Sequence, residues 1–320
     1  LPDSPSPESP WQSILIMHSA RRTASSHGHR HLVYGLAIES DFPLASVGDG
    51  SSSSEGLRLR LVPSAELRRR VGELKADPAD WIEHIVLGDG SVYMKLDGIF
   101  ETIVSADGAD VACARLADAD QRTFEANLLN FVLSAALTLR GEEPLHATVL
   151  ERDGRAFALL GPSGAGKSTL AAFLISRGAR LVTDDMLRLT FAGGRAVAHH
   201  GPHRLKLFDD QARLLLPDSV AAGHFNGLSG KLMVEPREDS TDRAWPRPLA
   251  AMFWLGDPPQ PDGVGSARLA GTALARALLS SAMNIRYHAP DRLARQMRFV
   301  ARVAETVPVH ALAYPRRHEL

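Results

Sequence analysis

The sequence predicts an α/β protein in which a P-loop domain follows a smaller β-rich domain. Residues 161–168 read Gly-Pro-Ser-Gly-Ala-Gly-Lys-Ser and fit the phosphate-binding pattern G-x-x-x-x-G-K-[ST] at every fixed position. Apolar segments at 155–160 and 169–175 flank this loop, as a strand before it and a helix after it require. Upstream, short apolar stretches separated by Gly-rich turns indicate a β-rich unit. We therefore divide the chain into a tail at 1–30, a β-rich domain at 31–118 and a P-loop domain at 119–320.

Composition excludes several classes of partner. The chain carries 36 basic and 37 acidic side chains, so no net field favours nucleic acid or an anionic membrane. No apolar run approaches the about 18 residues of a membrane span. The one cysteine, Cys113, excludes an intrachain disulfide and suits the reducing cytoplasm, where we expect the protein to act. The histidines at 27, 29 and 31 are expected to be solvated near the unstructured tail rather than to bind metal.

The β-rich domain is predicted from the spacing of its apolar residues. Residues 57–62 alternate apolar with basic side chains at period two, which is the pattern of a half-buried strand. Asp97-Gly98 is a turn sequence between two further apolar stretches. The expected strands cover residues 32–38, 57–62, 81–87, 92–96 and 100–104.

A helix over residues 120–140 is predicted next, with Gly141 at the position where a helix commonly ends. Its apolar side chains recur on one face, as an amphipathic helix requires. The residues on that face are Leu128, Leu129, Val132, Ala136 and Leu139.

A hairpin is predicted to lead into the phosphate loop. Its strands flank Asp153-Gly154, which is a two-residue turn sequence. With that turn, residue 150 faces 157, residue 148 faces 159, and His146 faces Gly161. An imidazole is therefore expected beside the bound phosphates.

The loop itself supplies the candidate nucleotide contacts. Its glycines let successive backbone N–H groups turn inward as an anion-binding nest, and the next helix adds the positive end of its dipole. Lys167 is expected to reach the β- and γ-phosphates and Ser168 to coordinate Mg²⁺, so ATP and Mg²⁺ are the expected cofactors. The candidate nucleotide-binding residues are Gly161, Ser163, Gly164, Ala165, Gly166, Lys167, Ser168 and Thr169.

Two adjacent carboxylates are expected at the phosphate end of the sheet. A helix at 168–177 precedes a strand at 179–183, which ends in Asp184-Asp185. A right-handed crossover brings the carboxyl ends of such strands to one edge. Because neighbouring strand residues point to opposite faces, the two aspartates must differ in role. We assign Asp184 as the base that accepts the proton of an attacking hydroxyl, and Asp185 as the Mg²⁺ ligand.

Basic residues further along are candidate substrate contacts. Arg204 and Lys206 follow a loop that holds three histidines, for which a metal cluster is the alternative to a plain basic loop. Lys231 is either a second phosphate-facing cation or a solvated loop lysine. Helices are expected at 266–282 and 291–304, the latter with Leu293, Met297, Val300 and Ala304 on one stripe.

In combination, His146, the phosphate loop and Asp184-Asp185 resemble the catalytic domain of HPr kinase/phosphorylase and its relatives. The resemblance spans residues 145–186 and extends more weakly through 202–207 and Lys231. It implies transfer of the γ-phosphoryl group of ATP to a serine hydroxyl on a protein, with His146 near the transferred group. It also makes assembly into a homo-oligomer an expectation.

Two departures from the family pattern narrow this expectation. Bifunctional members carry Asp after the first loop glycine and Glu after Lys-Ser, whereas this chain has Pro162 and Thr169, which argues against phosphorylase activity. Residues 33–44 resemble the leader of HPr-kinase-related proteins that include kinases of the C-terminal serine of lasso-peptide precursors. We therefore expect a serine kinase of a peptide or small protein. A kinase of a small-molecule hydroxyl and a non-catalytic ATP-sensing module are the open alternatives.

Overall fold

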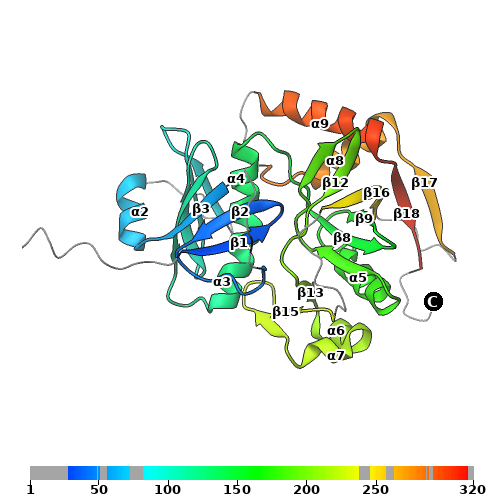
Figure 1. The fold of residues 1–320 in the computed structure, drawn as a ribbon, viewed down its shortest axis with the longest axis horizontal. Coiled ribbons are helices and arrows are strands. Elements are labelled where there is room, and N and C mark those ends of the chain that lie inside the picture. The colour runs from blue at the N-terminus through cyan, green and yellow to red at the C-terminus, as the bar shows by residue number, and fades with distance from the viewer. Residues whose placement is uncertain are drawn as a thin grey trace, which may run out of the picture.

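The computed structural model describes residues 28–48, 50, 56–72, 82–237, 246–256, 263–285, 287 and 291–315. Within them the chain is a mixed α/β protein with three sheets, and a helical segment lies between the two larger ones (Figure 1). Most of the predicted tail and the first residue of the strand predicted at 81–87 fall outside this description. No helix in the described part is long and apolar enough to cross a membrane.

The first sheet has seven strands and is covered on both faces. Its pairs are antiparallel except β2–β3 and β3–β7, which are parallel. Because side chains alternate along a strand, Val111 and Cys113 of β7 enter the core under the helical segment, whereas Ala112 and Ala114 pack towards α2 (Ser64–Val71). In spatial order the strands are β1 (His29–Val33), β2 (Leu36–Ser40), β3 (Gly56–Leu61), β7 (Asp110–Arg115), β6 (Phe100–Val104), β5 (Val92–Leu96) and β4 (Ile82–Val86).

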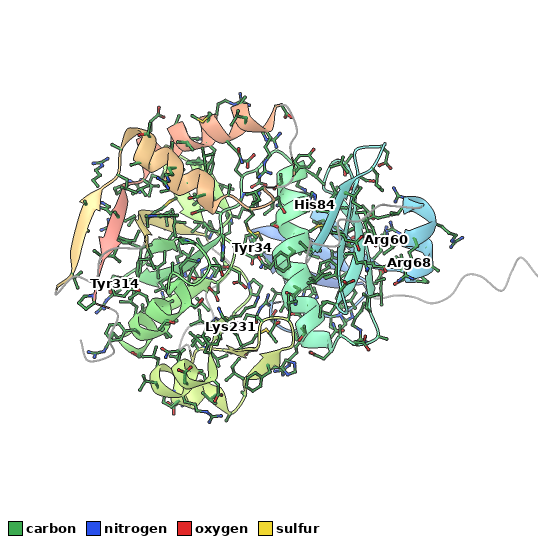
Figure 2. All side chains as sticks on the ribbon, turned by 180° about the vertical axis from the view of Figure 1, so that it is seen from behind. Tyr34, Arg60, Arg68, His84, Lys231 and Tyr314 are labelled. Carbon is green, nitrogen blue, oxygen red and sulfur yellow. The ribbon has the colours of Figure 1, made fainter. Side chains whose placement is uncertain are left out.

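The strand predicted at 32–38 is in fact the hairpin β1–β2. Its turn places Tyr34 at φ 54° and Gly35 at φ 70°. A non-glycine residue at positive φ is uncommon, so the apolar run indicated one continuous strand. Tertiary contacts hold the turn: Arg188 donates to the Tyr34 carbonyl at 2.9 Å, and the buried tyrosine lies where the two larger sheets meet (Figure 2).

The predicted helix at 120–140 is one continuous helical segment with a π-helical turn in its middle. It consists of α3 (Gln121–Asn127), η1 (Leu128–Val132) and α4 (Leu133–Leu139). Asp120 caps its start, since the carboxylate accepts from the Thr123 N–H at 2.9 Å. The segment packs against the first sheet in one core cluster, to which Phe124 and Leu133 belong.

The second sheet carries the predicted hairpin, and its register is confirmed. Pairs run from Ala147–Leu160 to Arg152–Arg155, around a turn with Asp153 at φ 53° and Gly154 at φ 75°. The sheet order is β10 (Arg180–Thr183), β8 (Ala147–Arg152), β9 (Arg155–Leu160), β16 (Arg247–Trp254), β12 (Arg195–Ala198) and β11 (Leu189–Ala192), with β18 (Val309–Ala313) beside β16 and β17 (Gly265–Arg268) beside β18. Because β8 runs antiparallel to both neighbours, β9 and β10 are parallel, and the carboxyl ends of both lie at one edge as predicted.

A third, small sheet covers that edge. It consists of β13 (Leu205–Leu207), β15 (Lys231–Val234) and β14 (His224–Asn226), with α6 (Asp209–Leu215) and α7 (Pro217–Val220) beside it. Its apolar residues share a core with α5 (Lys167–Ser176), the helix that follows the phosphate loop.

Two further helices, α8 (Gly271–Ser281) and α9 (Arg292–Thr306), pack on the second sheet and on each other. The helix predicted at 266–282 therefore begins later, after strand β17. The stripe predicted for α9 is wrong at Leu293 and Met297, which are 63% and 48% exposed, and at the exposed Ala304, whereas Val300 is buried as predicted, together with Val303.

Candidate functional site

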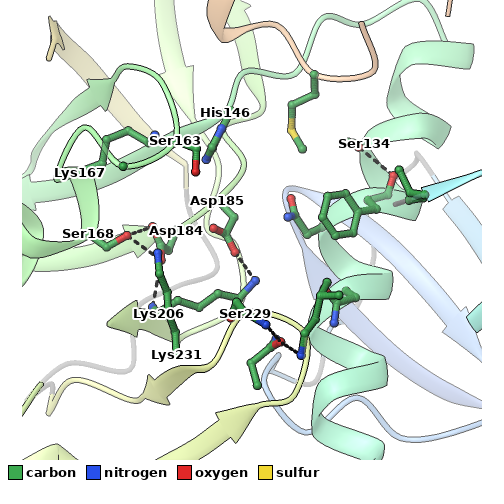
Figure 3. A pocket seen from close by; sticks show the side chains of 18 of the residues that line it. Ser134, His146, Ser163, Lys167, Ser168, Asp184, Asp185, Lys206, Ser229 and Lys231 are labelled. Atoms are coloured by element: carbon green, nitrogen blue, oxygen red, sulfur yellow. Dashed lines mark hydrogen bonds and ion pairs between the residues drawn. The ribbon is translucent and has the colours of Figure 1, made fainter. Parts of the chain in front are cut away.

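The phosphate loop opens into a cavity of about 870 Å³ (Figure 3). Four parts of the chain line it: the loop itself with His146 and the aspartates, the small sheet β13–β15, the segment α3–η1–α4 with β4 and β5, and the end of α8 with the turn after it. Residues from both larger sheets thus meet at one cavity, which lies at the carboxyl ends of β9 and β10.

The loop has the backbone shape that its glycines predict. Gly161, Gly164 and Gly166 adopt φ of 145°, 82° and 88°, and Gly166 precedes the first turn of α5. A Cβ on Gly161 would lie 2.5 Å from the Leu255 carbonyl oxygen, so close packing also requires glycine there. The Lys167 ammonium donates to the Gly161 carbonyl at 2.8 Å, and burial lowers its pKa.

The structure brings six of the predicted nucleotide-binding residues to the cavity: Ser163, Gly164, Gly166, Lys167, Ser168 and Thr169. Gly161 and Ala165 are not among the lining residues. Ala165 packs into the core around α5, and its N–H donates to the Pro162 carbonyl at 3.2 Å. These two residues shape the loop rather than face the cavity.

Asp184 follows β10 and lies next to Ser168. Its two oxygens are 3.4 and 3.5 Å from the Ser168 hydroxyl, and the Thr148 hydroxyl donates to it at 2.6 Å. The N–H of Lys206 donates to the same carboxylate at 3.1 Å. Burial, and after it the charge of Asp185, raise the pKa of Asp184 above its usual range. A cation beside Asp184 and Ser168 would offset that burial.

Asp185 faces a different neighbour. It adopts φ 70°, a left-handed conformation that turns the chain after β10, and the Lys206 ammonium lies 2.6 Å from its carboxylate. Burial would raise its pKa, but the charge and hydrogen bond of Lys206, with the charges of His146 and Arg204, outweigh burial and lower the pKa to about 2. Lys206 therefore contacts both carboxylates, one through its backbone and one through its side chain.

His146 lies beside the loop, at the start of the hairpin. The β8–β9 ladder ends at Ala147, and the His146 N–H instead donates to the Ser281 carbonyl at the end of α8, at 2.7 Å. Its ring lines the cavity close to Ser163 (Figure 3). Burial, followed by the charge of Lys167, lowers the pKa of His146 to about 4, so the imidazole is neutral at pH 7.

Of the two remaining candidate substrate contacts, one lines the cavity and the other does not. Lys231 lines the cavity, with its ammonium 5.1 Å from the centre of the Phe208 ring. Arg204 does not line it: the buried guanidinium donates to the Ser46 hydroxyl at 2.8 Å and to the Ala126 carbonyl at 2.9 Å. Arg204, directly before β13, thus ties this part of the chain to the loop after β2 and to α3.

The histidines of the neighbouring loop form other contacts. His199 pairs with the Thr190 hydroxyl at 2.8 Å, and His203 with the Pro236 carbonyl at 2.7 Å. Among the described residues, no group of three or more histidine, cysteine or acidic side chains is placed to hold a metal ion.

Sequence analysis missed the polar side chains that the helical segment contributes to the cavity. These are Asn127 and Asn130, with Ser134 one turn later. Their spacing of three and four positions is that of one helical face, and the available signal was the polarity of Asn130 and Ser134 within the largely apolar run at 128–139.

Comparison with known proteins identifies a distant relationship. No protein-family model matches the chain. Over 60 residues it is 38% identical to HPr kinase/phosphorylase of two strains of Treponema pallidum, and this match spans 19% of the chain and 19% of those relatives' length. Among solved structures, the Hpr(Ser) kinase/phosphatase of Coxiella burnetii matches with a TM-score of 0.27 and 14% identity, over 54% of this chain and 85% of that one. The 60-residue sequence match confirms the predicted resemblance as a distant similarity.

Proposed function

We propose that the protein is an ATP- and Mg²⁺-dependent kinase that phosphorylates a serine hydroxyl of a peptide or small protein. One observation carries the proposal: a glycine-rich loop, a buried carboxylate beside the loop serine, and a second carboxylate paired with lysine all line one cavity. Phosphoryl transfer needs little more than positioning and electrostatic stabilisation, and this combination supplies both.

The residues fit a magnesium ion at Ser168 and Asp184. Both offer hard oxygen donors, which Mg²⁺ prefers, and the two side chains lie within 3.5 Å of each other. The raised pKa of Asp184 reflects a buried carboxylate that a cation would stabilise in its charged form. When bound, Mg²⁺ would neutralise charge on the phosphates.

We propose that Asp185 is the base, which exchanges the two roles assigned from the sequence. Asp185 lines the cavity and pairs with Lys206, which favours its ionised form, whereas Asp184 is the carboxylate beside Ser168. In the reaction, the serine hydroxyl oxygen bonds to the γ-phosphorus, the bond from that phosphorus to the β-phosphate oxygen breaks, and ADP leaves. The hydroxyl proton passes to the Asp185 carboxylate.

Lys167 and His146 complete the proposed machinery. Lys167 would exchange its loop carbonyl partners for phosphate oxygens, since an ammonium binds an anion more strongly than a neutral carbonyl. The neutral His146 ring would hydrogen-bond the transferring group or the acceptor hydroxyl without adding charge. Lys231, which also lines the cavity, would contact the acceptor.

More specifically, we propose that the acceptor is the C-terminal serine of a lasso-peptide precursor, because residues 33–44 resemble the N-terminal part of kinases that act on such precursors. A free C-terminal carboxylate would find Lys231 in the same cavity. Action in the cytoplasm and assembly into a homo-oligomer remain part of this proposal.

Phosphate transfer and nucleotide binding test the proposal separately. The protein is incubated with ATP, Mg²⁺ and synthetic serine peptides with free or amidated C-termini, and products are read by mass spectrometry. Asp185→Asn is expected to retain Mg²⁺-dependent ATP binding and to lose transfer by at least a hundredfold, whereas Asp184→Asn loses the Mg²⁺ dependence of binding. Asp153→Asn, in an exposed turn, is the matched control. Transfer at the wild-type rate by Asp185→Asn would refute the assignment of Asp185 as the base. ATP binding without transfer to any peptide would refute the proposed peptide-kinase activity.

A further inference from the structure

The cavity has a second wall that the phosphate chemistry does not use. It faces the phosphate loop across Asp185 and is formed by the segment α3–η1–α4, with β4, β5 and the turn after α8 (Figure 3). Ser134 lies on this wall, opposite Lys167 and Ser168 (Figure 3). A group held against it would approach the proposed base from the side away from the nucleotide.

One side chain on this wall lacks a partner within the described part of the chain. Asn130, in the π-helical turn, is 7% exposed and lines the cavity, and its Oδ1 accepts no hydrogen bond there. Its neighbours on the same face are satisfied, because the Asn127 amide donates to the Thr123 carbonyl at 2.8 Å and the Ser134 hydroxyl donates to the Phe131 carbonyl at 2.8 Å. A buried unpaired amide oxygen is unfavourable, and π-helical turns occur often at functional sites. The oxygen itself is covered in this conformation, and a rotation of the amide about its terminal torsion would turn it to the cavity, where it could accept an N–H or O–H from a ligand.

The wall is uncharged. It presents amides, a hydroxyl, thioethers and an aromatic ring, and among its described lining residues His84 is the one titratable side chain. A charged group brought against such a surface would lose hydration without gaining a counter-charge. The wall therefore favours an uncharged partner that donates hydrogen bonds.

The rim indicates the length of that partner. Phe208 and Leu228, beside strands of the small sheet, are 58% and 41% exposed, and Ile285, in the turn after α8, is 68% exposed. Apolar side chains that continue outward from a polar wall suit an extended chain, whose main-chain N–H groups bind within and whose side chains pack at the rim. A small metabolite would leave this rim uncovered.

From these features we infer that the wall around Asn130 is the acceptor subsite and that it takes a peptide serine whose neighbouring residues carry no charged side chain. Asn130 Oδ1 accepts a main-chain N–H next to the acceptor serine. This inference rests on the proposed kinase activity and adds to it the chemical class of the acceptor.

The test is two sets of synthetic peptides, acetyl-Gly-Xaa-Ser-Xaa-Gly-amide and acetyl-Gly-Xaa-Xaa-Ser with a free C-terminal carboxylate, with free serine alongside. The wild-type protein is expected to phosphorylate peptides with uncharged Xaa at least tenfold more efficiently than those with Asp, Glu, Lys or Arg. Asn130→Ala should raise the KM for peptide about three- to tenfold, the effect of one hydrogen bond, with the KM for ATP unchanged. Asn130→Asp keeps the acceptor oxygen and should shift the preference towards Lys and Arg, a change that a structural role would not produce.

Thr123→Ala is the matched control, since it removes another buried oxygen of the same helical segment that is unpaired among the described residues, at a position that does not line the cavity. It is expected to leave both the peptide KM and the preference for flanking residues unchanged. Equal use of charged and uncharged peptides, efficient use of free serine, or an unchanged peptide KM in Asn130→Ala would each overturn the inference. ATP binding with no peptide phosphorylated also overturns it, whereas absence of ATP binding would instead refute the proposed function.

Discussion

Protonation of His146 is expected to lower the free energy of unfolding, by an amount that follows from its shifted pKa. Burial and the charge of Lys167 lower its folded-state pKa from 6.5 to about 4. Below pH 6.5 the unfolded chain therefore binds a proton that the native protein excludes, and stability is lost as the pH falls towards 4. A difference of one between the folded and unfolded pKa corresponds to about 1.4 kcal/mol, so the full loss is about 3 kcal/mol, of which about 2 kcal/mol develops between pH 7.5 and pH 5.

The change that isolates this effect is His146→Gln, which keeps a polar side chain but does not titrate. Urea unfolding of both proteins at a series of pH values gives the difference in unfolding free energy, in which titrations common to both cancel. We expect the wild type to lose about 2 kcal/mol relative to His146→Gln between pH 7.5 and pH 5. NMR of the imidazole, assigned by its absence in the variant, gives the pKa directly. Parallel stability curves, or a titration midpoint near 6.5, would refute the reasoning.

Two further changes test the site and the loop. Lys206→Met removes the main group that opposes the effect of burial on Asp185, so the pKa of that carboxyl should rise and the acid limb of the pH profile of kcat should move to higher pH. Lys206→Arg should leave the pH profile unchanged. An acid limb at the wild-type pH in Lys206→Met would contradict the pairing of Lys206 with Asp185. Gly161→Ala should destabilise the fold by about 1–3 kcal/mol more than Gly154→Ala, because both glycines have positive φ but an added Cβ meets the Leu255 carbonyl at position 161 and open space at 154. Equal unfolding free energies of these two variants would exclude that clash.

The parts of the structure that the sequence predicted are those set by local rules. The Asp153-Gly154 turn fixed the pairing of β8 with β9, and the crossover after the phosphate loop brought Asp184 to the same edge. The features that could not be predicted from the sequence depend on contacts between distant segments of the chain. The hairpin at Tyr34 requires an unfavourable φ that distant partners hold.

Long-range packing also decided which basic residues reach the cavity. Arg204 and Lys206 are two positions apart and looked equivalent in the sequence, yet one pairs with Ser46 and the other with Asp185. The wall around Asn130 likewise forms only when the helical segment is placed against both larger sheets.

The position of Arg204 has a consequence for how this protein can be divided or recombined. Cutting the chain near residue 118 would remove the Ser46 hydroxyl from a buried guanidinium and expose the apolar helix face that carries Phe124 and Leu133. We therefore expect that the part of the chain after residue 118 does not fold independently, although it contains the phosphate loop and both aspartates. A chimaera with a different leader would keep its function only if the new leader supplied an acceptor for Arg204 and an apolar surface for that helix.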